Sequence, residues 1–160
     1  MSYLFESFKG WKEYCHKNDM SLFECVLEYE RDQKGNDDDA IWNGLSRAYS
    51  VMKDAVNTGL TEEMTSRSEM INNGAKKVFN HSTTVLSKEF QKLISRALAA
   101  KEVNSCMGRI VAAPTAGASG ILPGTLYTLQ EIHGLEDKKI YEGLLIGAGI
   151  ALIIEQRASL

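Results

Sequence analysis

The chain has 160 residues, of which 44% are apolar and 24% are charged, and its formal net charge is −3. This composition is ordinary for a globular protein, and it excludes a strongly basic nucleic-acid binder, whose affinity depends on cationic contacts with phosphates. The longest apolar run, residues 143–154, is shorter than the roughly 20 residues that a membrane-spanning helix needs. We therefore expect neither nucleic acid nor a membrane among its partners.

The first third of the chain predicts two helices. Ser21 and Glu24 have the spacing of a capping box, in which each side chain binds a backbone N–H group of the other residue. Apolar residues then recur at helical spacing. The acidic residues 37–39 indicate a second, solvated helix start rather than a cation site, because the positive end of the helix dipole attracts them. Its apolar positions lie within residues 41–56, and residues 57–59 predict its end.

The remaining segments also read as helices. Residues 61–82 are polar and interrupted, so we expect a short helix and loops there. Ser87 is a plausible cap for a helix that reaches about Val103. A short helix over about 125–132 and a long one over about 136–158 follow. The sequence thus predicts an all-α, bundle-like fold.

For two of these helices the sequence also predicts which residues are buried. The helix after Ser87 has two apolar strips, formed by Phe90, Ile94 and Leu98 and by Leu93, Ala97 and Ala100. We expect both strips to be buried. The run 143–154 contains three glycines, which are Gly143, Gly147 and Gly149. We interpret it as a buried helix with close neighbours and not as a dinucleotide site, because the third glycine of that motif and a preceding strand are both absent.

Cysteines and histidines show no metal-site spacing. The three cysteines, which are Cys15, Cys25 and Cys106, are odd in number and include no Cys-x-x-Cys pair. Free thiols and a cytoplasmic setting are therefore expected. The three histidines, which are His16, His81 and His133, are isolated in sequence and are expected at the surface or at helix ends.

The most informative segment is residues 104–124, with the sequence NSCMGRIVAAPTAGASGILPG. It contains a loop of small residues: Pro114, Thr115, Ala116, Gly117, Ala118, Ser119 and Gly120. Gly117 and Gly120 allow close approach of a ligand and can adopt positive φ. Backbone N–H groups beside a helix start near Pro123 suit a carboxylate or phosphate. A tight connection between packed helices is the alternative interpretation.

Residues 104–124 resemble, almost residue for residue, the signature region of the α subunit of iron–sulfur-dependent L-serine dehydratases. Residues 21–30 and 143–160 are similar to the same subunit in the same order, so the resemblance covers essentially the whole chain. Such a contiguous match is far more specific than a glycine pattern alone. It implies that residues 1–160 are the N-terminal part of a larger, mainly helical catalytic domain.

The resemblance also implies a reaction. Members of this family convert L-serine to pyruvate and ammonia by β-elimination, using a four-iron–four-sulfur (4Fe-4S) cluster and no pyridoxal phosphate. Three cysteines hold the cluster and leave one iron open as a Lewis acid for the β-hydroxyl. A β subunit or β domain completes the enzyme, and a homo-oligomer is left open.

The matching positions give a candidate substrate site. The loop is expected to hold the substrate carboxylate through Pro114, Thr115, Ala116, Gly117, Ser119 and Gly120, and Asn104 is expected to add a hydrogen bond. Arg109 either pairs with a carboxylate or lies on the surface. No residue is assigned as the catalytic base.

Two departures from the family pattern limit this expectation. The family's first cluster cysteine follows the equivalent of Leu160, so we expect all three cluster ligands to be missing and the chain to be truncated. Cys106 then serves only as a small residue within the motif. Residues 66–80 lack the Gly-rich pattern of many relatives, which leaves substrate contacts from that stretch in doubt. The 160 residues alone are expected to be inactive.

Two other functions compete with this interpretation. The missing cysteines also suit a non-catalytic helical remnant or an interaction module, and the sequence beyond Leu160 would discriminate these. A pyridoxal-phosphate lyase is not favoured, because no lysine lies in a Schiff-base context.

Overall fold

The computed structural model describes residues 5–81, 84–113 and 115–157. Within these ranges the chain forms helices and no strand beyond an isolated antiparallel bridge between Thr65 and Asn72. The helices are α1 (Phe8–Lys17), α2 (Leu22–Lys34), α3 (Asp38–Thr61), α4 (Gly74–Asn80), α5 (Lys88–Ser105), α6 (Ile121–His133) and α7 (Asp137–Arg157). The all-α prediction is confirmed. None of the described helices is long and apolar enough to cross a membrane.

The chain divides into two compact units. The first unit contains the described residues up to Ser46 and those from Asp137 onward, which include α1, α2, α7 and the start of α3. The second unit is Arg47–Glu136, which contains the rest of α3 together with α4, α5 and α6. The prediction of one domain over residues 1–160 stays a prediction.

Local capping explains where the helices of the first unit begin. The predicted capping box is present: Ser21 Oγ accepts from the Glu24 backbone N–H at 3.4 Å, and Glu24 Oε2 accepts from the Ser21 N–H at 2.7 Å. Helix α2 ends at Gly35, whose φ of 66° is the left-handed conformation that glycine adopts without strain. Helix α1 was not predicted; its cap is Ser7, whose Oγ accepts from the Gly10 N–H at 3.1 Å.

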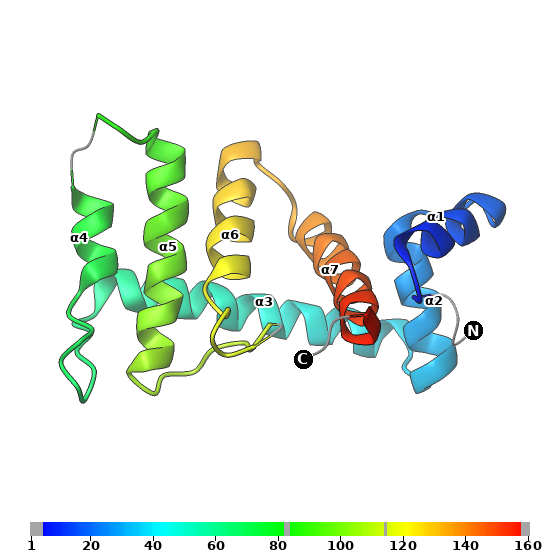
Figure 1. Ribbon diagram of the computed structural model, residues 1–160, viewed down its shortest axis with the longest axis horizontal. Helices are drawn as coiled ribbons and strands as arrows, with labels where there is room; N and C mark the ends of the chain where they lie inside the picture. Colours follow the sequence, from blue (N-terminus) through cyan, green and yellow to red (C-terminus); the bar gives the residue numbers. More distant parts are fainter. Residues whose placement is uncertain (1–4, 82–83, 114, 158–160) are drawn as a thin grey trace. The chain divides into compact units, whose positions relative to one another are not determined.

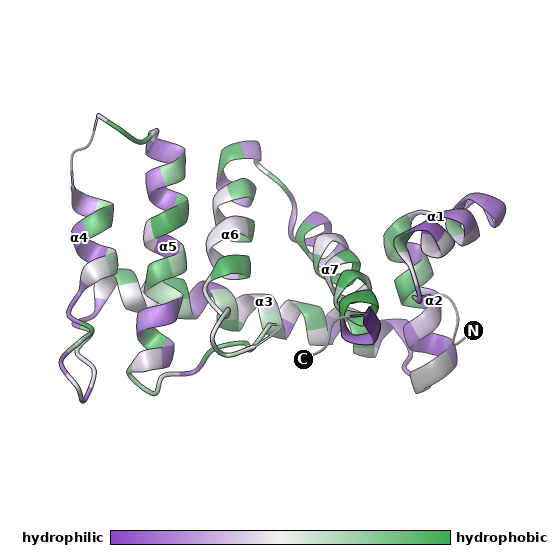
Figure 2. Cartoon of the chain, in the orientation of Figure 1, coloured by the Kyte–Doolittle hydropathy of each residue, from purple (hydrophilic) through white to green (hydrophobic). Residues whose placement is uncertain are grey.

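The first unit is built around apolar side chains from α1, α2, α3 and α7, and Figure 2 shows the many hydrophobic residues along α7. Gly149 lies at the tightest contact of this core: a Cβ there would be 2.7 Å from the Trp11 ring and 2.9 Å from Val26. A Cβ on Gly143 or Gly147 would meet no atom within 4 Å. The expectation of close neighbours is therefore right for Gly149 and wrong for the other two.

In the second unit, α4, α5 and α6 lie side by side, and α3 runs across one face of this row (Figure 1). The predicted end of α3 at residues 57–59 is wrong, since the helix continues to Thr61. Gly59 serves packing instead: a Cβ there would lie 2.4 Å from the carbonyl oxygen of Ala99 on α5. A glycine that reads as a stop signal in sequence thus lets two helices touch.

The prediction that both apolar strips of α5 are buried is right for Ala100 and wrong for Phe90 and Leu98. Phe90 is 50% exposed and Leu98 is 37% exposed, whereas the buried positions are Ser95, Arg96, Ala99, Ala100, Glu102 and Val103. Helix α5 presents small and polar residues to α4 and α6 because those helices approach closely and supply partners for the polar groups. The strip of Phe90, Ile94 and Leu98 therefore does not mark the buried face of this helix, whereas the second strip includes the fully buried Ala100.

Helix α6 begins at Ile121, four residues before its predicted start. Pro123 lies in its first turn, where the missing N–H group would have no helical partner in any case. Both Gly120 and Gly124 contact Ala97 so closely that a Cβ would lie 2.1 Å and 2.7 Å from its backbone atoms. The short helix and loops expected within residues 61–82 are confirmed as α4 and the turns before it.

Candidate functional site

The end of α5 fixes the position of Asn104. After Ser105 the chain turns sharply through Met107, whose φ is 65°, and the Gly108 N–H returns to the Val103 carbonyl at 2.8 Å. A Cβ on Gly108 would lie 2.5 Å from Val103 Cγ1, so only glycine fits this turn without a shift. The turn directs the small-residue segment back past Asn104.

Asn104 ties this helix end to the loop of residues 115–120. Its Nδ2 donates to the Ala116 carbonyl oxygen at 2.9 Å, and Ser119 Oγ donates to the same oxygen at 2.8 Å. Thr115 Oγ1 accepts from the Ala118 N–H at 3.2 Å. Ser119 Oγ thus donates inside the loop and Thr115 Oγ1 accepts there, so both hydroxyl groups that looked available for a ligand help to determine its shape.

The loop has an exposed half and a buried half. Thr115, Ala116 and Gly117 are exposed, whereas Ser119 is 1% exposed and Gly120 is buried. Within the described residues, the backbone N–H groups of Ala116 and Gly117 donate to no other residue. The exposed half therefore offers neighbouring N–H donors, the groups that bind an anion. Pro114, also predicted to be a site residue, lies outside the described residues.

The glycines of the loop do not have positive φ. Among the described residues, only Gly35 and Gly134 are glycines with that conformation. Gly120 has a φ of −86° and packs against Ala97, whereas a Cβ on Gly117 would make only an ordinary contact, 3.6 Å from Thr115 Oγ1. Gly120 therefore belongs to the helix contact, which supports the alternative interpretation for that residue. Gly117 keeps the exposed backbone accessible.

Glu102 lies two residues before Asn104 and is only 4% exposed, and no sequence pattern predicted a role for it. Its Oε1 accepts from the Ala75 N–H at the start of α4, at 3.1 Å, and Gly74 leaves room for it. Its Oε2 is buried and has no hydrogen-bond partner among the described residues. The only sequence signal is that Glu102 shares a helical face with the small residues Ser95 and Ala99.

Arg96 was also missed, and it joins α5 to α6. Its guanidinium donates to Thr128 Oγ1 at 3.2 Å and to the Glu131 carboxylate, and it lies 4.2 Å from the centre of the Tyr127 ring. Hydrogen bonds from Lys92 and then Arg96 hold the pKa of Glu131 below its usual value. This ion pair fixes α6, and with it the end of the loop, against α5.

The other candidate residues lie at the surface. Arg109 is 3.8 Å from Asp54, and both side chains are mostly exposed, so the contact is weak. His16, His81 and His133 are exposed, as predicted. Asp37 caps α3 by accepting from the Ala40 N–H at 2.7 Å, which confirms that residues 37–39 form a helix start.

The cysteines do not suit an iron–sulfur cluster. Cys15 and Cys25 lie together in the first unit, whereas Cys106 belongs to the second unit. The part of the chain that the structure describes contains no group of three or more His, Cys, Asp or Glu side chains that could hold a metal ion. These residues therefore do not fit a cluster that needs three thiolates at one place.

Comparison with known proteins gives one family. A family model described as serine dehydratase alpha chain matches residues 17–160. This match includes α2 to α7 and the loop, and so nearly all of the described structure.

Relatives carry related names. The chain is 30% identical over 148 residues to the L-serine dehydratase alpha chain of Peptoniphilus asaccharolyticus, covering 91% of this chain and 51% of that protein. It is 30% identical over 148 residues to the L-serine dehydratase of Streptomyces coelicolor, covering 88% and 32%. The probable L-serine dehydratase alpha chain of Bacillus subtilis is 25% identical over 160 residues, covering 98% and 53%. The chain thus spans about half or less of these relatives. No solved structure matches it significantly.

Proposed function

Because the chain belongs to the serine dehydratase alpha-chain family, we propose that the protein deaminates L-serine to pyruvate and ammonia. We propose further that residues 115–120 bind the substrate carboxylate. The names of the relatives support the reaction, and the geometry of the loop supports the role of this segment. The activity is proposed for the complete enzyme, since the chain spans only part of its relatives.

The observation that carries the role of the loop is the pair of side-chain hydrogen bonds to the Ala116 carbonyl oxygen, which also accepts from the Ser119 backbone N–H. The side chains of Asn104 and Ser119 both donate to this oxygen, so it already has hydrogen-bond partners within the protein. What remains at the exposed half is a pair of N–H donors on Ala116 and Gly117, next to the N-terminal end of α6. Donors at the positive end of a helix dipole favour a carboxylate over a cation.

The chemistry of elimination is not assigned to this chain. The 4Fe-4S cluster expected from the resemblance finds no fitting ligand set among the described residues, so no step is derived through it. The cluster and a β subunit or β domain belong to the proposal for the complete enzyme. In that enzyme the loop binds and orients the substrate, and we expect the 160 residues alone to make no pyruvate.

The proposal is tested with the full-length protein and its β partner, purified without oxygen. Pyruvate formation from L-serine is expected, and the iron content of the complex is measured in parallel. A complex that binds no iron and makes no pyruvate would sink the proposed reaction. Pyruvate formation by the 160-residue chain alone would contradict the division of roles between the loop and the rest of the enzyme.

A second measurement tests the loop separately. Asn104→Ala removes the donor that holds Ala116, and we expect KM for L-serine to rise about tenfold with a smaller change in kcat, the effect of losing roughly one hydrogen bond. Ser105→Ala is the matched control, because Ser105 Oγ donates to the Lys101 carbonyl within its own helix. Equal kinetics for the two variants would contradict the role of the loop in binding L-serine, but would not contradict the proposed reaction.

A further inference from the structure

Cys15 and Cys25 form a close pair of thiols in the first unit. Their Sγ atoms are 2.8 Å apart, and both residues are free cysteines. Heavy atoms that are not bonded usually approach to about 3.5–4.0 Å, and an S–S bond is about 2.05 Å long. The two sulfurs are therefore closer than ordinary neighbours. Neither residue belongs to the proposed substrate site.

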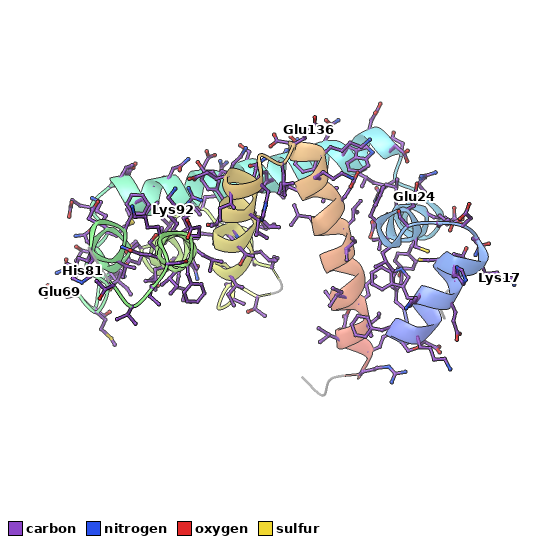
Figure 3. All side chains as sticks on the ribbon, turned by 90° about the horizontal axis from the view of Figure 1, so that it is seen from above. Lys17, Glu24, Glu69, His81, Lys92 and Glu136 are labelled. Atoms are coloured by element: carbon purple, nitrogen blue, oxygen red, sulfur yellow. The ribbon has the colours of Figure 1, made fainter. Side chains whose placement is uncertain are left out.

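The two thiols sit at the ends of neighbouring helices. Cys15 lies in the last turn of α1, and Cys25 lies in the first turn of α2, as the chain can be followed between Lys17 and Glu24 in Figure 3. Only the connection of residues 18–21 separates the helices. A bond between the sulfurs would close this short connection into a loop and tie α1 to α2.

The two thiols differ in access. Cys25 is 0% exposed, whereas Cys15 is 5% exposed and lines an open apolar groove between α1, α2 and α7, together with Trp11, Met20 and Ile150. A small neutral oxidant can enter such a groove and reach Cys15 before Cys25. Cys15 is therefore the thiol that we expect to be oxidised first, and Cys25 is the partner that lies within bonding reach of it.

We propose that Cys15 and Cys25 form a reversible intramolecular disulfide when the protein encounters hydrogen peroxide. The Cys15 sulfur attacks one peroxide oxygen, the O–O bond breaks, and a sulfenic acid and one water form. The Cys25 sulfur then attacks the Cys15 sulfur, and the S–O bond breaks as the oxygen leaves in a second water with the remaining protons. In sum, two thiols are oxidised to a disulfide and one peroxide is reduced to two waters.

The environment of Cys25 supports this order of events. Burial, and then the hydrogen bond with Cys15, raises the pKa of Cys25 to about 12. A thiol that keeps its proton is a poor first nucleophile toward peroxide. Cys25 can still react in the second, intramolecular step, because its sulfur is already in contact with the Cys15 sulfur. A dithiol reductant reverses the reaction by thiol–disulfide exchange.

The experiment uses the Cys106→Ser variant, which leaves only the two thiols of the pair. The folded variant is treated with peroxide, alkylated after unfolding, and measured as intact protein and as peptides. We expect both alkylation sites to disappear together, a mass lower by two hydrogen atoms, and a peptide in which Cys15 and Cys25 are joined. Dithiothreitol should restore both thiols. The same cross-link should appear in the wild-type chain.

Two further variants in the same background test the order of the reaction. With Cys25→Ala, Cys15 should stop at a sulfenic acid that dimedone traps. With Cys15→Ser, Cys25 should remain reduced at the same peroxide concentration. The proposal is overturned if the Cys106→Ser protein gains oxygen atoms without a cross-link, or if it forms only intermolecular disulfides. It is also overturned if the thiols stay reduced under conditions that oxidise the urea-unfolded protein.

Discussion

At the scale of single residues, the structure is organised by polar side chains buried in α5. Arg96 is 7% exposed and Glu102 is 4% exposed, and each finds its partners on a different neighbouring helix. Buried charged groups are costly unless their polar atoms find partners, so the Arg96–Glu131 pair and the bond to Glu102 Oε1 favour one arrangement of α4, α5 and α6. The other carboxylate oxygen of Glu102 has no partner among the described residues. The loop depends on this arrangement, because Asn104 extends from the same helix.

Glu102 allows the first prediction. Glu102→Ala should lower the free energy of unfolding by about 2–3 kcal/mol, since it leaves the Ala75 N–H without its acceptor and opens a cavity. Glu102→Gln keeps the Oε1 acceptor and removes the carboxylate, so its cost should be smaller. Urea unfolding of both variants measures this difference. Equal losses would mean that the charge of Glu102 matters more than its hydrogen bond.

Glu131 gives a pH-dependent prediction. Its pKa is lowered from the usual 4.5 by hydrogen bonds from Lys92 and Arg96. The folded state therefore holds the proton less tightly than the unfolded state. The stabilisation is complete above the unfolded pKa and is lost as the pH falls through the folded pKa.

The measurement compares Glu131→Gln with the wild type in urea from neutral to acidic pH. At neutral pH we expect the variant to be less stable by about 1 kcal/mol, because water screens the Glu131 side chain, which is 41% exposed. The difference should vanish in acid, where Glu131 of the wild type is also protonated. Glu136→Gln, at an exposed position labelled in Figure 3, is the control and should differ little at any pH. A difference that persists in acid would argue against the ion pair.

At the scale of elements, close helix contacts depend on single glycines. Gly59 brings α3 against Ala99, Gly120 and Gly124 bring α6 against Ala97, and Gly149 admits the ring of Trp11. Each contact is too tight for a Cβ atom unless backbone or ring atoms move. The packing contact between Gly120 and Ala97 therefore helps to determine the position of the loop.

Helix α7 offers a matched pair of glycine substitutions. Gly149→Ala should destabilise the protein by about 1–3 kcal/mol, because its methyl group would overlap Trp11 and Val26. Gly147→Ala, two residues earlier, meets open space and should stabilise the helix by roughly 0.5–1 kcal/mol. Thermal unfolding should therefore shift in opposite directions for the two variants. An unchanged or higher unfolding temperature for Gly149→Ala would show that Gly149 does not lie against the core.

At the scale of the whole molecule, the chain has two compact units, and each has its own buried cluster. Val26 belongs to the cluster of the first unit and Val56 to that of the second, and both are 0% exposed. No residue belongs to both clusters. Local stability should therefore differ between the units when only one core is weakened.

Val26→Ala and Val56→Ala test this independence and serve as controls for each other. Each removes two methyl groups from a full core, at a cost of about 1.5–3 kcal/mol. Hydrogen exchange followed by mass spectrometry should show faster exchange mainly in α1, α2 and α7 for the first variant. For the second, α4, α5 and α6 should exchange faster. Uniform acceleration along the chain in both variants would indicate a single cooperative unit.

The sequence alone determined the features that depend on neighbouring residues. The capping box of Ser21 and Glu24, the cap at Ser87 and the family signature in residues 104–124 are all local patterns, and the first two are present as predicted. Such signals act through backbone groups three or four residues apart, so no knowledge of the fold is needed to recognise them.

Only the tertiary structure decided which residues meet across the chain. In the sequence Gly59 resembles a helix stop, but in the fold it lies against Ala99. Glu102 resembles a surface residue, but in the fold it accepts a hydrogen bond from Ala75. The cysteine pair at residues 15 and 25 carries no local motif either. The same applies to the loop, which the Asn104 side chain ties to the end of α5 through the Ala116 carbonyl oxygen, twelve residues away. These properties arise from contacts between distant segments, whose geometry the local pattern does not contain.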